Sequence, residues 1–147
     1  MGGVLMSSSI EVTVILCDSA QVDPRGKVHM LGAGWSRTGS PTAPSSVVVM
    51  LGIPWDRTNQ PIPVVIELVD ADGHRVHVPG QLGPEPIRID ASVEVGRPVG
   101  ADEGITLEAA LAPSFPPLPL PPGRYSWTVE VDGNITAKPF AVVVNPA

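Results

Sequence analysis

The sequence predicts an all-β protein: a single-domain antiparallel β-sandwich of about nine strands. Apolar and polar residues alternate strictly in residues 87–95 and again in residues 125–131. Successive side chains of a strand point to opposite faces, so each segment has one dry and one wet face. Turn formers are abundant (15 Gly, 18 Pro), while 43% of the 147 residues are hydrophobic. A turn-rich chain of this length can bury a core in one domain.

The first half of the chain provides three predicted strands. Residues 10–20 are apolar on both faces, which is typical of a central strand. A turn at residues 23–26 contains Pro and Gly at favourable positions and leads into a second strand at residues 27–35. We therefore expect these two strands to form a hairpin, followed after a Pro-containing loop by a strand at residues 47–53.

The second half begins with a predicted hairpin, residues 62–69 and 75–78, around the turn at residues 70–74. The remaining strands are expected at residues 87–95, 105–111, 125–131 and 140–144. The Pro-rich segments 79–86 and 113–122 are interpreted as a loop and as a polyproline-II crossover that cannot pair as a central strand. Residues 1–9 are expected to be a flexible arm that precedes the sandwich domain of residues 10–147.

Charge and hydropathy argue against two classes of partner. The net charge is −6 and the nine basic residues are scattered, whereas nucleic-acid binding uses clustered basic residues. No apolar run approaches the roughly 20 residues that span a bilayer. The N-terminal segment lacks the basic region of a secretion signal. We therefore expect neither a nucleic-acid nor a membrane partner, and a cytoplasmic or virion-associated protein.

Candidate metal ligands occur together only at the turn, where Asp70 and Asp72 lie near His74 and His77. On a strand, residues three apart face opposite sides, so the two imidazoles are poorly placed to share a metal. The Asp-rich run also lacks the glycine spacing of a calcium loop. The interpretation is a structural hairpin without a metal. Cys17, the one cysteine, lies in an apolar run and is interpreted as a buried, inert thiol.

Signatures of catalysis are missing from the sequence. It contains no nucleophile-elbow motif, no phosphate loop and no dinucleotide fingerprint, and its carboxylates are spread over polar strand faces. We therefore predict no enzyme and no cofactor. Residues 119–124 fit the pattern of a polyproline ligand for an SH3-like groove. We favour a stiff crossover into the next strand for this segment.

The tryptophans and the N-terminal arm are the candidate interaction residues. Trp127 shares strand parity with apolar residues and is predicted to lie in the core. Trp35 ends a predicted strand and Trp55, near Arg57, lies in a predicted loop; each could bind a partner or cap the sandwich. Asp56 and Arg57 are expected to pair locally. The apolar residues of the arm, Val4, Leu5 and Met6, would be buried by an assembly partner.

Residues 20–35, 54–61 and 118–133 together resemble a family of small, uncharacterised proteins from actinobacteria and their phages. This resemblance implies no activity. Residues 122–133, in which a Pro-Gly turn leads into a strand with inward aromatic residues, also resemble the penultimate strand of immunoglobulin-like and fibronectin-III-like domains. That second resemblance implies an immunoglobulin-like sandwich.

The expected function is a non-catalytic structural or interaction role, as an accessory component of a larger assembly such as a phage capsid or tail. The partner would be another protein or further copies of this chain. The alternative is a module that binds a small molecule or carbohydrate through its loop aromatic residues. A hydrolytic enzyme is the third hypothesis, and it would require a polar pocket with paired carboxylates or a His beside a nucleophile.

Overall fold

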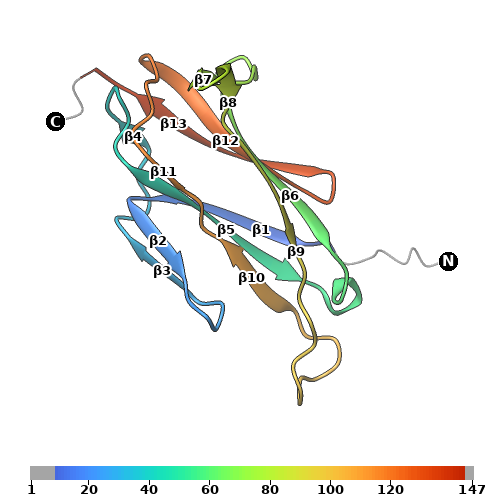
Figure 1. Ribbon diagram of the computed structural model, residues 1–147. Helices are drawn as coiled ribbons and strands as arrows, with labels where there is room; N and C mark the ends of the chain where they lie inside the picture. Colours follow the sequence, from blue (N-terminus) through green and yellow to red (C-terminus); the bar gives the residue numbers. More distant parts are fainter. Residues whose placement is uncertain (1–8, 145–147) are drawn as a thin grey trace.

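The computed structural model describes residues 9–144, and in this range the predicted all-β sandwich is confirmed. Two sheets, antiparallel except for one short edge strand, pack face to face, with two small hairpins attached to them (Figure 1). The only helical segment of the described range is a three-residue 3₁₀ turn, η1 (Trp55–Arg57). No helix there is long and apolar enough to cross a membrane.

The first sheet has β5 (Ser45–Ile53) at its centre, between β1 (Glu11–Cys17) and β10 (Leu107–Leu111). The prediction for residues 113–122 was wrong at its start, because Ser114 and Phe115 form β11, which pairs with β5. β10 and β11 continue in one register along β5. Pro113 interrupts them because it has no N–H, but its carbonyl still accepts the Val47 N–H at 3.1 Å.

The second sheet has five strands in the order β4 (Arg37–Thr38), β13 (Asn134–Val142), β12 (Gly123–Val131), β6 (Ile62–Asp70) and β9 (Arg88–Val93). β4 runs parallel to β13 and the other neighbours are antiparallel. Strict alternation buries one side of β6 and β12. Trp127, which is 2% exposed, lies in this core as predicted and stacks on Phe115 with ring centroids 4.5 Å apart.

The predicted strand at residues 10–20 is broken at Asp18. β1 pairs with β5, whereas β2 (Ser19–Val22) leaves the sheet and pairs with β3 (Val28–Leu31). The hairpin around residues 23–26 is therefore present, but as a separate two-stranded sheet. β2 lies against β5, and Cys17 and Val48 are fully buried although they face away from the core. We infer that the hairpin covers this part of the outer face.

Residues 79–86 were wrongly expected to be a loop. β7 (His77–Gly80) and β8 (Gly83–Pro86) form a second small hairpin at one end of the sandwich (Figure 1). The predicted strand at residues 75–78 pairs with β6 only through the bridge between Val69 and Arg75, and then turns away into β7. These additions bring the described range to thirteen strands, against the expected nine.

The two long sides of the sandwich differ. We call the side with β1, β13 and β4 the closed side, because β1 and β13 contact each other across the sheets. Phe140 and Val142 of β13 are 5% and 2% exposed there. The segment after β4 is fastened to the crossover by the Thr42 hydroxyl, which accepts the Leu118 N–H at 2.8 Å. The opposite side lies between β9 and β10.

Candidate functional site

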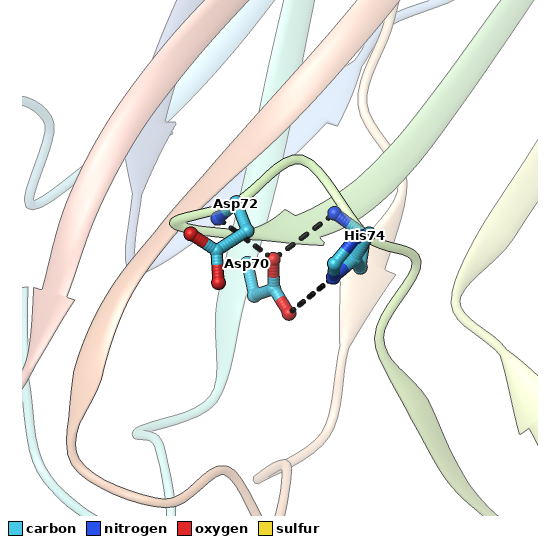
Figure 2. Close-up of side chains that lie close together, drawn as sticks. All are labelled: Asp70, Asp72 and His74. Carbon is cyan, nitrogen blue, oxygen red and sulfur yellow. Dashed lines mark hydrogen bonds and ion pairs between the residues drawn. The ribbon is translucent and has the colours of Figure 1, made fainter.

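The turn between β6 and β7 holds a group of possible metal ligands, Asp70, Asp72 and His74, whose ligand atoms lie within 4.8 Å of one another (Figure 2). Asp70 Oδ1 accepts the N–H groups of Asp72 at 2.9 Å and of His74 at 3.0 Å. His74 Nδ1 lies 4.0 Å from Asp70 Oδ2. His77 is not in the group. The Asp70 carboxylate thus already has a structural task, because it closes the turn that the sequence predicted.

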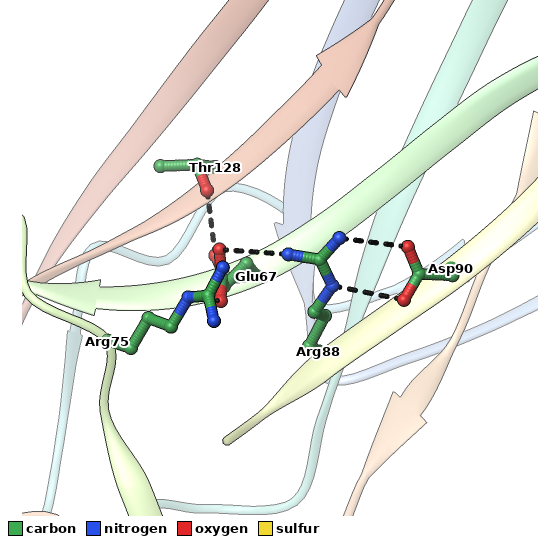
Figure 3. A network of polar contacts seen from close by, with 5 residues as sticks. All are labelled: Glu67, Arg75, Arg88, Asp90 and Thr128. Atoms are coloured by element: carbon green, nitrogen blue, oxygen red, sulfur yellow. Dashed lines mark hydrogen bonds and ion pairs between the residues drawn. The ribbon is translucent and has the colours of Figure 1, made fainter.

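A second polar group lies on the outer face of the five-stranded sheet (Figure 3). Arg88 donates two hydrogen bonds to Asp90, at 3.0 and 3.1 Å, and this lowers the pKa of Asp90. Glu67 lies 3.8 Å from Arg88 and 2.8 Å from Arg75. The Arg75 N–H is not aligned for a hydrogen bond, so the buried Glu67 Oε2 has only an ion pair. The two arginines thus hold the carboxylates of Glu67 and Asp90, which favours a structural network over an anion site.

Arg57 does not form the local pair with Asp56 that the sequence suggested. Its guanidinium donates to both carboxylate oxygens of Asp132, at 2.6 and 3.0 Å, and this lowers the pKa of Asp132. Asp132 and Gly133 form the two-residue turn between β12 and β13, with φ of 56° and 81°. Asp and Gly tolerate this left-handed conformation. The pair thus joins the η1 turn to a hairpin turn 75 residues away.

Trp55 is half-buried and one of its faces is occupied. The Arg97 guanidinium carbon lies 4.1 Å from the centroid of the indole, a cation–π contact. Arg97 also donates to the Trp55 carbonyl at 2.8 Å and to the Thr58 hydroxyl at 2.7 Å. Trp55 lines a surface cavity of about 330 Å³ together with the carboxylate residues Glu11 and Asp56. At this cavity a predicted loop tryptophan meets a hollow and polar groups.

Trp35 packs against the closed side. It is half-buried, and its ring meets Phe140 edge-on at 5.5 Å. Its indole Nε1 is buried without a hydrogen-bond partner. This placement fits the capping role, one of the two roles that the sequence left open. The other candidates, Val4, Leu5 and Met6, lie outside the described residues, as does the rest of the predicted arm except Ser9.

Cys17 is buried, as predicted. Its side chain is fully covered, its thiol lies 3.7 Å from the Ser46 carbonyl oxygen, and burial raises its pKa. A thiol in this environment is protonated at neutral pH and has no access to a substrate.

Nothing in the sequence pointed to the side opposite the closed side. Six apolar residues of β9 and β10 stand opposite fully buried residues of β6 and β5, so they face the core, yet they are only half-buried. We call this surface the open side; its residues are Ile89, Ala91, Val93, Leu107, Ala109 and Leu111. The alternation in β9 predicted which side chains face inward. It carried no signal that β9 is an edge strand.

Comparison with known families gives one finding. Residues 12–143 match a family that is described only as a family of unknown function (DUF6941). Comparison with curated proteins gives no match.

Proposed function

The chain belongs to the family of unknown function DUF6941, and we propose that it acts as a non-catalytic interaction module within a larger protein assembly. The observation that carries this proposal is the open side. There, six inward-facing apolar residues of β9 and β10 stay half-exposed, while their neighbours on β5 and β6 are fully buried. Apolar residues that stay partly exposed together at one side of a fold are typical of a protein contact.

The polar groups of the described range support a non-catalytic role. Asp70 closes a turn, Asp132 is held by Arg57, and Glu67 and Asp90 are paired with arginines. Each of these carboxylates is thus committed to a structural contact. Catalytic carboxylates and histidines are instead expected to converge on a pocket with shifted pKa values.

The more specific form of the proposal is an accessory protein of a phage capsid or tail, built on an immunoglobulin-like sandwich. It rests on the resemblance of residues 20–35, 54–61 and 118–133 to proteins of actinobacteria and their phages. The chain would then be virion-associated, or cytoplasmic before assembly.

Photo-crosslinking in cells tests the proposal. A crosslinking amino acid replaces Leu107 on the open side or, as the control, Lys138, an exposed residue of β13 at the closed side. We expect crosslinked products from position 107 and none from position 138. Mass spectrometry then identifies the partner, and a capsid or tail protein would support the virion form. Equal products at both positions, or none at 107, would contradict the interaction role.

One observation favours a second candidate, a small-molecule or carbohydrate-binding module. Trp55, Glu11 and Asp56 share a cavity, and an indole beside carboxylates suits a sugar or a small cation. A glycan array followed by Trp55→Ala tests it. We expect binding that Trp55→Ala abolishes; unchanged binding by the variant would remove this candidate.

A further inference from the structure

β9 is an edge strand with one unpaired side. It pairs with β6 over Arg88–Val93, and these residues make no other backbone hydrogen bond within the described range. Residues 88–93 contain neither proline nor lysine, the residues that commonly protect an edge. The N–H and C=O groups that point away from β6 are therefore free to pair with another strand.

The side chains of β9 add an apolar contact to this free edge. Three apolar residues of β9 are half-buried: Ile89, Ala91 and Val93. Their partners on β6, in the same order, are Ile66, Val64 and Ile62, and all three partners are fully buried. A strand added beside β9 would cover their exposed edges, as β6 covers them on the other side. An added strand would thus satisfy the backbone and also bury the part of the open side that β9 contributes.

We propose that the added strand is β9 of a second copy, so that two chains join edge to edge in an antiparallel, twofold-symmetric dimer with Ala91 opposite Ala91. This inference deepens the proposed function, on which it rests, by naming the partner of the open side. A twofold interface uses the same surface on both chains, and antiparallel pairing of one strand with itself has this symmetry.

The charges of β9 select the register. Its outer face carries Arg88, Asp90 and Ser92, and Glu94, which continues the alternation in the sequence, follows directly after the strand. Setting Ala91 opposite Ala91 places Arg88, whose guanidinium also donates to Asp90 of its own chain, opposite Glu94 of the other copy, twice by symmetry. The same register places Asp90 opposite the neutral Ser92. Opposite charges on facing strands stabilise a pair, and like charges destabilise it.

Neighbouring registers are less favourable. A shift that sets Asp90 opposite Asp90, or Asp90 opposite Glu94, brings like charges together on the outer face. Shifting the pairing by one residue would turn apolar side chains to the wet face. Centring on Ile89 keeps opposite charges together, but it draws in Pro86 of β8, which already pairs with His77. The register centred on Ala91 pairs residues 88–94 and puts a small side chain on the axis.

The first test is the mass of the purified full chain in solution, by light scattering or sedimentation. We expect a dimer that dissociates on dilution. A monomer at every concentration, whether its open side stays free or is covered by residues 1–8, would overturn the inference.

Charge substitution on the axis tests the register. Ala91→Lys or Ala91→Glu places two like charges face to face, and each should weaken association about tenfold or more. Mixing the two variants should restore the dimer, because Lys then stands opposite Glu. Ala137→Lys, on the exposed outer face of β13, is the control and should dimerise as the wild type. Circular dichroism verifies that each variant is folded. A dimer that persists in Ala91→Lys, or no recovery on mixing, would refute the pairing.

Disulfide trapping gives an independent test. Directly opposite residues in antiparallel strands have Cα atoms about 4.5–5.5 Å apart, within the range that a disulfide spans. Ala91→Cys should therefore form a covalent dimer on oxidation. Glu94→Cys should not, because position 94 would face position 88 and lie far from its own copy. The native Cys17 is fully buried and should not interfere. Trapping at 94 but not at 91 would contradict the register.

The two proposals fail in different ways. A monomer in solution whose position 107 crosslinks to another protein in cells overturns the dimer and retains the interaction role. A dimer trapped at position 91 whose position 107 crosslinks to no other protein supports the pairing and contradicts the larger assembly.

Discussion

Val142 and Val93 are the same residue type on the inner face of the same sheet, but they lie on opposite sides of the sandwich. Val142 is 2% exposed, whereas Val93 is half-buried. The difference comes from what lies beyond each strand. β4 pairs with β13 next to Val142, and Trp35 packs on the neighbouring Phe140. No described strand pairs with the edge of β9 that points away from β6. The same apolar side chain is therefore buried at one edge and half-exposed at the other. The difference is that the short strand β4 pairs with β13, whereas the edge of β9 is left as a potential interface.

The largest expected effect is the loss of stability when a phenylalanine is replaced by alanine, and each side of the sandwich offers one such position. Phe140 is 5% exposed, with its ring centroid 5.5 Å from Trp35 and 5.8 Å from Tyr125. We expect Phe140→Ala to lower the free energy of unfolding by about 3–5 kcal/mol. Phe115→Ala, at a half-buried position of β11 on the side of β10, should cost clearly less. Urea unfolding measures both, and equal losses would break the comparison.

Removing a single hydroxyl group at the closed side should lower the stability of the fold. Thr42 is 7% exposed and accepts the N–H of Leu118. Thr42→Val keeps the shape but leaves that N–H without a partner, at a cost of about 1–3 kcal/mol. Thr42→Ser keeps the acceptor and is the control. A Thr42→Val protein as stable as Thr42→Ser would mean that the bond contributes nothing to the closed side.

The two valines give the most direct comparison. Val142→Ala should cost about 2 kcal/mol, since both lost methyl groups were buried. Val93→Ala should cost about 1 kcal/mol in dilute solution, where the chain is a monomer. If a second copy covers β9, this cost should rise with protein concentration, because association stabilises the folded state. Thermal unfolding at several concentrations measures both, and a cost for Val93→Ala that ignores concentration would argue against that cover.

The smallest effect is expected at the end of the sandwich, where Arg57 holds Asp132. The folded-state pKa of Asp132 is lowered from its ordinary 3.8 by the hydrogen bonds from Arg57. The pair therefore stabilises the fold above that value, and its contribution is lost as the pH falls through the lowered pKa. Asp132→Asn keeps a residue that tolerates positive φ and removes the charge. Its small deficit in melting temperature at neutral pH should vanish in acid; a deficit independent of pH would exclude the ion pair as its cause.

Features encoded by neighbouring residues could be predicted from the sequence. The turn at residues 23–26 forms because Asp23 Oδ1 accepts the N–H groups of Arg25 and Lys27, and such side-chain-to-backbone bonds are local. The turn at Asp70 follows the same rule, and strand alternation correctly placed Trp127 in the core. In each case the signal and the contact lie in the same short segment.

Features that depend on distant partners could not be predicted. Ser114 and Phe115 pair with β5 although prolines lie on both sides, because β10 already fixes the register. Arg57 selects Asp132 rather than the adjacent Asp56 because the fold brings the two turns together. The candidate interaction surface was missed for the same reason. The alternating pattern of β9 is identical for a central and an edge strand.

The hairpin of β2 and β3 makes the single cysteine a useful reporter. Cys17 is the only thiol in the chain and is fully covered on the outer face of the first sheet. A thiol reagent can reach it only when this cover lifts or the chain unfolds. The labelling rate under native conditions therefore measures local opening at one defined position, without any engineered probe. Comparing that rate with global unfolding would tell whether the hairpin detaches on its own.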